Sequence, residues 1–415
     1  MVKSLPGPLV VHPHNVYSGS TLHTEGKFDT PGPGRNALFT TVILPDGQQH
    51  RVQIDTGSCG LVLPASMLTD SAGKPLPHVK YVRSFSMTYH PSGDVVAGAI
   101  YAIEYVQFPL ADGSGVVTTD PLYILGTDRG DPGMMGIGFG RANVPAGTDQ
   151  PYPNCVPPAG LFSSSQPAAD TDGEAAKNPA QLSNALLNIQ GMAAGTVPAN
   201  YVITSGPISA LALGVDSTDL GKFDFLTLSK QYPKLTSYPP NSPYYATPSY
   251  QITLSAYNDG KPFPCPTLLD TGVDCIMIRI PPGGDSKHSI SGWTSGYDWA
   301  SPNLLGQTLT VSAYPTGSTT PMMQYSFAFG TVHATYTGSS PSNATVTANL
   351  DPAQGSTAMA PSNLLPLAEA STAPTTFFIN IGINPLANYD YCFDANNSRV
   401  GFRPALAPFD NGGIQ

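Results

Sequence analysis

Two copies of an Asp-Thr-Gly triplet are the residues of this sequence best suited to chemistry, and an apolar run precedes each copy. The first is Asp55-Thr56-Gly57-Ser58 and the second is Asp270-Thr271-Gly272-Val273, so the aspartates are 270 − 55 = 215 residues apart. At average residue usage one triplet arises by chance in roughly one chain of this length in ten, so a matched pair is a rare coincidence. A carboxylate at the end of a buried strand needs hydrogen-bond donors, and the Thr and Gly that follow can supply them.

Paired carboxyls of this kind can hydrolyse an amide bond. If the two halves of the chain pack about a pseudo-twofold axis, Asp55 and Asp270 face each other, and two carboxyls that share hydrogen bonds retain a single proton. The pair can then polarise a water molecule, one member acting as general base while the other protonates or hydrogen-bonds the carbonyl oxygen. The competing interpretation is that each Asp only caps a turn in an ordinary β protein. We would prefer that interpretation for a single copy, and the matched pair makes it the weaker one.

Length and composition favour two β-rich lobes. A chain of 415 residues exceeds one ordinary core and suits two units of about 200 residues each. Charged residues make up only 11%, while 42 Gly and 43 Pro supply frequent turns, which favours many short strands. The net charge of −10, without a basic cluster, argues against nucleic acid as a partner. No apolar run is long enough for a membrane span.

The sequence indicates no metal and no other cofactor. The eight His are scattered, and the five Cys lack the close paired spacing of a zinc site. Cys265 and Cys275 flank the second triplet, so they either form a disulfide or remain buried free thiols.

Both halves of the chain follow the same order of predicted elements. In each half a β-hairpin runs into Asp-Thr-Gly, further strands follow, and a glycine-spaced apolar strand comes last. The leucines of residues 179–191 recur at helical spacing and predict one helix. We therefore predict a mostly β, bilobal fold with a central substrate cleft. Residues 1–35 form an N-terminal arm or a propeptide remnant, residues 36–197 the first lobe and residues 198–415 the second.

These motifs resemble those of the pepsin-like aspartic endopeptidases. Both triplets are similar to the catalytic motifs of that family, and residues 389–402 are the most specific match outside them. The resemblance covers about residues 38 to 404 and implies the pepsin-like acid protease fold, with Asp55 and Asp270 as the catalytic dyad. It also implies supporting roles around the dyad. Thr56 and Thr271 would cross-link the lobes beneath it, Ser58 would hydrogen-bond the outer oxygen of Asp55, and the turn glycines would be Gly57 and Gly272.

A second resemblance concerns the flap that closes over the substrate in that family. Ser86-Met87-Thr88-Tyr89 is similar to it, which implies Tyr89 as the flap tyrosine. His90 follows it in the flap, where it either contacts the substrate or is a solvated loop histidine. We expect Tyr89, Ile137 and Phe139 to line the cleft, which predicts a preference for apolar side chains.

Three departures from the family pattern bear on activity. Val273 stands where Thr or Ser is usual, so we expect Asp270 to lack one outer hydrogen bond and to be the carboxyl that titrates unusually. Val62 occupies the usual Trp position, and Pro91 in the flap cannot donate a backbone N–H to a bound peptide. The departures indicate a divergent member, with bacterial or fungal relatives.

The predicted function is that of an aspartic endopeptidase, which hydrolyses peptide or protein substrates best at acidic pH because the dyad must retain a proton. We expect a monomer that is inhibited by pepstatin, contacts no membrane, and is secreted or otherwise exported, although no signal peptide is visible. The alternative is a pepsin-fold binding or inhibitor protein without proteolytic activity. A dimeric retroviral-type protease is disfavoured because both motifs lie in one chain.

Overall fold

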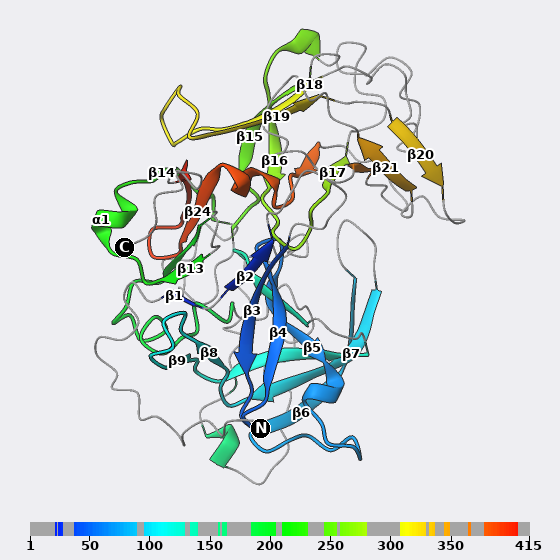
Figure 1. Cartoon of the computed structure of the whole chain (residues 1–415), viewed down its shortest axis with the longest axis vertical. Helices are drawn as coiled ribbons and strands as arrows, with labels where there is room; N and C mark the ends of the chain where they lie inside the picture. Colours follow the sequence, from blue (N-terminus) through cyan, green and yellow to red (C-terminus); the bar gives the residue numbers. More distant parts are fainter. Residues whose placement is uncertain are drawn as a thin grey trace.

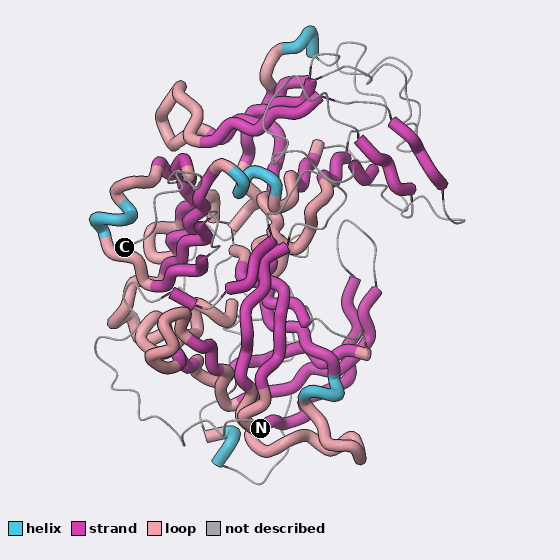
Figure 2. The backbone as a smooth tube through the Cα atoms, in the orientation of Figure 1, coloured by secondary structure: helices cyan, strands magenta, loops and turns pink. Residues whose placement is uncertain are grey.

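The computed structural model of the chain is mostly β (Figure 2). It describes residues 21–22, 24–27, 37–88, 95–128, 133–139, 157, 160–163, 184–204, 210–230, 245–254, 258–279, 308–328, 332–336, 344–348, 364–366 and 377–405. Within these ranges the only α-helix is α1, the single turn Ser217–Leu220, and no helix there is long and apolar enough to cross a membrane. The 3-10 turns are η1 (Ala65–Met67), η2 (Leu161–Ser163), η5 (Asn258–Gly260) and η9 (Asn384–Ala387).

The first half of the chain forms a ten-stranded sheet, drawn in blue and cyan in Figure 1. Its strands pair in the order β6-β7-β10-β5-β11-β4-β3-β8-β9, and β2 pairs with β3. They are β2 (Thr24–Lys27), β3 (Ala37–Ile43), β4 (Gln49–Asp55), β5 (Cys59–Pro64), β6 (Val79–Thr88), β7 (Val95–Ile103), β8 (Gln107–Pro109), β9 (Val116–Thr118), β10 (Leu122–Thr127) and β11 (Gly133–Ile137).

The second half forms a nine-stranded sheet at the opposite end of the molecule (Figure 1). Its order is β19-β18-β15-β16-β23-β17-β22-β21-β20. The strands are β15 (Ser249–Leu254), β16 (Phe263–Leu268), β17 (Ile276–Arg279), β18 (Thr308–Ala313), β19 (Met323–Ala328), β20 (Val332–Tyr336), β21 (Ala344–Ala348), β22 (Leu364–Pro366) and β23 (Phe378–Asn380).

A six-stranded sheet draws its strands from distant parts of the sequence. Its order is β1-β13-β12-β24-β25-β14, so the first strand that the structure describes lies in one sheet with strands of residues 200–227 and 389–404. The strands are β1 (Thr21–Leu22), β12 (Asn200–Thr204), β13 (Ala210–Leu213), β14 (Asp224–Thr227), β24 (Tyr389–Asp394) and β25 (Arg399–Pro404).

The two large sheets repeat one arrangement of five strands. The order β10-β5-β11-β4-β3 in the first sheet corresponds to β22-β17-β23-β16-β15 in the second. The senses also agree, because the first and third pairings are parallel and the second and fourth antiparallel in both sheets. An Asp-Thr-Gly turn follows β4 in one copy and β16 in the other, so the repeated sequence motif belongs to a repeated structural unit.

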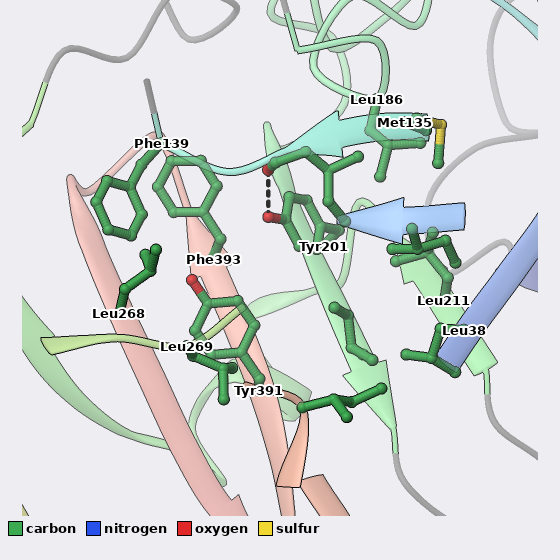
Figure 3. Close-up of a cluster of buried hydrophobic side chains, with 14 of the residues drawn as sticks. Leu38, Met135, Phe139, Leu186, Tyr201, Leu211, Leu268, Leu269, Tyr391 and Phe393 are labelled. Atoms are coloured by element: carbon green, nitrogen blue, oxygen red, sulfur yellow. Dashed lines mark hydrogen bonds between the residues drawn. The ribbon is translucent and has the colours of Figure 1, made fainter. Parts of the chain in front are cut away.

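A core of buried apolar side chains joins these sheets (Figure 3). Phe393 of β24 contacts Phe139, which follows β11, with ring centroids 6.1 Å apart. The hydroxyl of Tyr201 donates a hydrogen bond of 2.5 Å to the carbonyl oxygen of Ile137, marked by the dashed line in Figure 3. Ile137 and Phe139 are therefore buried in the core, and the prediction that they line a cleft is wrong.

The predicted helix is also wrong for the part that the structure describes. Residues 184–192 form a series of turns. The side-chain oxygen of Asn184 accepts hydrogen bonds from the backbone N–H groups of Leu186 (3.0 Å) and Leu187 (3.3 Å), and Ile189 pairs with the residue that follows β9. The leucine spacing arose because these side chains are buried, not because the backbone is helical.

Candidate active site

Equivalent pairs of strands position the two aspartates. Asp55 ends β4, which pairs in parallel with β11 so that Gly136 lies opposite Asp55. Asp270 follows β16, which pairs in parallel with β23, and its backbone N–H donates to the carbonyl oxygen of Gly382 at 3.3 Å. A side chain on Gly136 would meet the hydroxyl of Ser58 at 2.7 Å, so glycine is required for the close approach.

The two threonines cross-link the turns reciprocally. The backbone N–H of Thr56 donates to Oγ1 of Thr271 at 3.0 Å, and the backbone N–H of Thr271 donates to Oγ1 of Thr56 at 3.1 Å. The hydroxyl of Thr56 then donates at 2.8 Å to the carbonyl oxygen of Leu269, and the hydroxyl of Thr271 donates at 2.8 Å to the carbonyl oxygen of Ile54. All four groups are buried, so these contacts hold the two turns together.

A further cross-link comes from Gln53, which the sequence analysis did not single out. Its Nε2 donates to the carbonyl oxygen of Gly272 at 2.9 Å, so the strand of the first motif contacts the turn of the second. In the sequence Gln53 is recognisable only as a polar residue inside the apolar run that precedes Asp55.

Asp55 accepts both hydrogen bonds that the sequence analysis assigned to its turn. The backbone N–H of Gly57 donates to Oδ1 at 2.6 Å, and the hydroxyl of Ser58 donates to Oδ2. The carboxyl of Asp55 is 4% exposed, so these donors replace the water that it has lost.

Asp270 also has a donor for each oxygen, and one of these was not foreseen. The backbone N–H of Gly272 donates to Oδ1 at 2.9 Å, and Nδ2 of Asn380 in β23 donates to Oδ2 at 2.6 Å. The expectation that Val273 leaves Asp270 without an outer hydrogen bond is therefore wrong. Asn380 stands out in sequence only as a polar residue in the apolar run at residues 377–383.

The pair has an unusual electrostatic setting. Among the described residues four Asp are buried, and Asp390 and Asp394 form ion pairs with Arg403 (2.8 Å) and Arg399 (2.7 Å). Asp55 forms no ion pair within this part of the chain and instead shares a hydrogen bond with Asp270.

The pKa of Asp55 is raised well above its ordinary value of 3.8. Burial is the main cause, followed by the charge of Asp270 and the hydrogen bond with it, while the donors Ser58 and Gly57 oppose the shift. That Asp270 is the carboxyl that titrates unusually stays a prediction.

The raised pKa predicts how stability depends on pH. The folded state binds the proton of Asp55 more tightly than the unfolded chain does, so protonation of Asp55 stabilises the folded state. This stabilisation is complete below about pH 4 and is lost as pH rises through the raised folded pKa. Urea unfolding between pH 3 and 8, roughly spanning that window, should show the free energy of unfolding of the wild type falling relative to that of Asp55→Asn as pH increases. Parallel pH profiles for the two proteins would contradict this prediction.

The turn glycines are expected to tolerate no side chain. A Cβ on Gly57 would lie 2.2 Å from Cγ of Asp270, and one on Gly272 would lie 2.8 Å from Cγ of Asp55. Because donors hold both carboxyls, Gly57→Ala should destabilise the fold by about 2 to 3 kcal/mol, measured by urea unfolding. Gly115→Ala is the matched control, since a Cβ there meets no atom within 4 Å, and it should stay within about 0.5 kcal/mol of wild type. Equal losses in both variants would contradict the steric argument.

The predicted flap residues Tyr89, His90 and Pro91 lie outside the described residues. The strands that flank them, β6 and β7, do form the predicted hairpin, with Thr88 opposite Val95. A cavity of about 530 Å³ lies beside this hairpin, where Phe85, Tyr101 and Asp128 line it together with small side chains.

Four of the cysteines lie in the part of the chain that the structure describes. Cys59, Cys265, Cys275 and Cys392 are all buried, and Cys265 and Cys275 are not joined by the disulfide that the sequence left open.

Two comparisons with known proteins identify no family for this chain. No protein-family model matches the chain, and a search of the curated proteins finds no match either.

Proposed function

We propose that this chain is an aspartic endopeptidase of the pepsin-like type, with Asp55 and Asp270 as its catalytic dyad. One observation carries the proposal: two buried carboxyls on repeated turns share a hydrogen bond, and the pKa of Asp55 is raised as a result of burial and of its neighbour. Such a pair keeps a proton at a pH where a lone exposed carboxyl has lost its own. The repeated five-strand order supports a bilobal fold, with lobes at residues 36–197 and 198–415.

In the proposed reaction, the singly protonated pair activates a water molecule. The ionised carboxyl removes a proton from water as the water oxygen bonds to the carbonyl carbon, and the protonated carboxyl gives its proton to the carbonyl oxygen. The carbon–nitrogen bond of the resulting diol then breaks. The nitrogen takes a proton from one carboxyl while the other carboxyl accepts a hydroxyl proton, which restores the singly protonated pair.

The proposal includes an apolar substrate preference, for which Ile137 and Phe139 no longer provide support. The cavity beside the β6–β7 hairpin does not replace that support, because Asp128 and two serines line it together with Phe85 and Tyr101. We further propose a monomeric, exported enzyme that pepstatin inhibits and that needs no cofactor.

A peptide-library digest read by mass spectrometry tests the proposal, at roughly pH 3 to 6 around ordinary carboxyl pKa values and again at neutral pH. We expect cleavage that is strongest at acidic pH and is blocked by pepstatin. Failure of the folded chain to cleave any peptide, with pepstatin still bound, would favour the non-proteolytic alternative. The donor from Asn380 weakens that alternative, since it compensates for the departure at Val273.

A further inference from the structure

The two carboxyls differ in the chemistry of one donor. We call Oδ1 of each carboxyl its inner oxygen and Oδ2 its outer oxygen. Each inner oxygen accepts a backbone N–H, from Gly57 for Asp55 and from Gly272 for Asp270. The outer oxygen of Asp55 contacts the hydroxyl of Ser58, whereas the outer oxygen of Asp270 contacts the amide of Asn380. A hydroxyl can donate or accept, but an amide NH₂ group can only donate.

The amide of Asn380 is fixed in its donating orientation. Its Oδ1 accepts the backbone N–H of Gly382 at 3.0 Å, and a backbone N–H can only donate, so the NH₂ group must face Asp270. Asn380 is 2% exposed, and its strand β23 pairs on both sides, with β16 and with β17. The donor therefore cannot turn away when the state of Asp270 changes.

The repeated strands show that the two donors occupy non-equivalent positions. Asn380 lies opposite Met277, seven residues after Asp270 (277 − 270 = 7). In the first copy Met134 lies opposite Val62, seven residues after Asp55 (62 − 55 = 7). The first copy thus takes its outer donor from the turn and the second from the neighbouring strand.

We propose that Asn380 is a positioning residue that assigns the single proton of the pair, so that Asp55 carries it and Asp270 is ionised. A proton on the outer oxygen of Asp270 would oppose the N–H of Asn380, whereas the hydroxyl of Ser58 can reverse and accept from a protonated Asp55. Resting on the proposed function, this allocation makes Asp270 the general base toward water and Asp55 the acid toward the carbonyl oxygen.

The other titratable groups near the pair do not disturb this allocation. Burial, then the charges of Asp274 and Asp270, raises the pKa of the Cys275 thiol to about 12, so it is neutral throughout the relevant range. Burial likewise raises the pKa of Tyr201, which lies near Asp55, well above its ordinary value. Among the described residues Asp274 is a further charged group beside Cys275, and it is only partly buried, so water screens its charge.

Carbon-13 NMR of protein labelled at aspartate Cγ tests the allocation without using activity. The signals are assigned with Asp55→Asn and Asp270→Asn, and spectra are recorded between the two ionisations of the pair. We expect Cγ of Asp270 at the position of an ionised carboxyl and Cγ of Asp55 at that of a protonated one. The reverse assignment, or two equal intermediate shifts, would overturn the proposal even if the chain proves to cleave no peptide.

Variants then test whether Asn380 causes the allocation. In Asn380→Leu the difference in shift between the two carboxyls should shrink, and the acidic limb of kcat/KM should move up by about one to two pH units, because a charged hydrogen bond is lost. Adding Val273→Ser to Asn380→Leu should restore stability, because the new hydroxyl can donate to Asp270. It should not restore the full difference in chemical shift, because a hydroxyl can also accept a hydrogen bond from a protonated Asp270. Asn384→Leu is the control, because that buried amide donates to the carbonyl oxygens of Asp274 and Ile381. A wild-type shift difference in Asn380→Leu would overturn the role of Asn380.

Discussion

Asp55→Asn or Asp270→Asn is expected to lower kcat/KM for peptide cleavage by at least about 10³-fold, the scale typical of losing a general acid or base. An amide is nearly isosteric with a carboxyl, so the shape of the site is kept. In Asp55→Asn the hydroxyl of Ser58 can reverse and accept from the new NH₂ group, whereas in Asp270→Asn that group faces a fixed donor, from Gly272 or Asn380, and some stability is lost. An amide can neither remove a proton from water nor donate one, so it cannot perform either role. Initial rates on a peptide found in the library digest measure the effect.

The double variant separates a shared role from two independent ones. If the carboxyls act as one unit, Asp55→Asn/Asp270→Asn should be no slower than either single variant, because the second change removes nothing that is still working. Urea unfolding of each variant controls for folding. Cleavage that continues at the wild-type rate in a folded single variant would refute the dyad.

Thr271→Val is expected to cost about 2 to 6 kcal/mol of unfolding free energy, the largest effect on stability that the site predicts. The change removes one hydroxyl that both accepts and donates. It leaves the buried N–H of Thr56 and the buried carbonyl of Ile54 without their partner at this site, and each unsatisfied group costs about 1 to 3 kcal/mol.

A double-mutant cycle with Thr56→Val tests whether the two threonines form one cross-link. We expect the double variant to lose less than the sum of the single losses, by about 0.5 to 3 kcal/mol, because the groups contact each other directly. Thr310→Val is a matched control, since its hydroxyl makes an exposed hydrogen bond with Ser326. Additive losses, or an equal loss at Thr310, would show that the threonines act separately.

The strands and the motif contacts were predictable because they depend on short-range patterns. Alternating apolar residues and turn chemistry located β3, β4, β15 and β16, and the resemblance of the triplets to the catalytic motifs of pepsin-like endopeptidases implied the contacts of Thr56, Ser58 and Thr271. The helix was misplaced because buried leucines in a series of turns can repeat at helical spacing by chance.

The rest of the site depends on contacts that sequence spacing does not encode. Asn380 reaches Asp270 across 110 residues, and Gln53 reaches Gly272 across 219. Neither motif requires these residues, so only the strand register reveals them. The burial of Phe139 likewise depends on Phe393 of the six-stranded sheet, which an apolar pattern in one strand cannot show.

The make-up of the six-stranded sheet has a consequence for synthesis of the chain. Strand β12 pairs with β24 at residues 389–394, so the sheet cannot close until these residues have left the ribosome. The carboxyl pair itself joins residues 215 apart, and pairings at such separations form slowly. An incomplete chain that ends before the second triplet contains Asp55 without Asp270. If the pair is a protease, newly made protein therefore stays inactive at least until the second triplet has been made and has paired with the first.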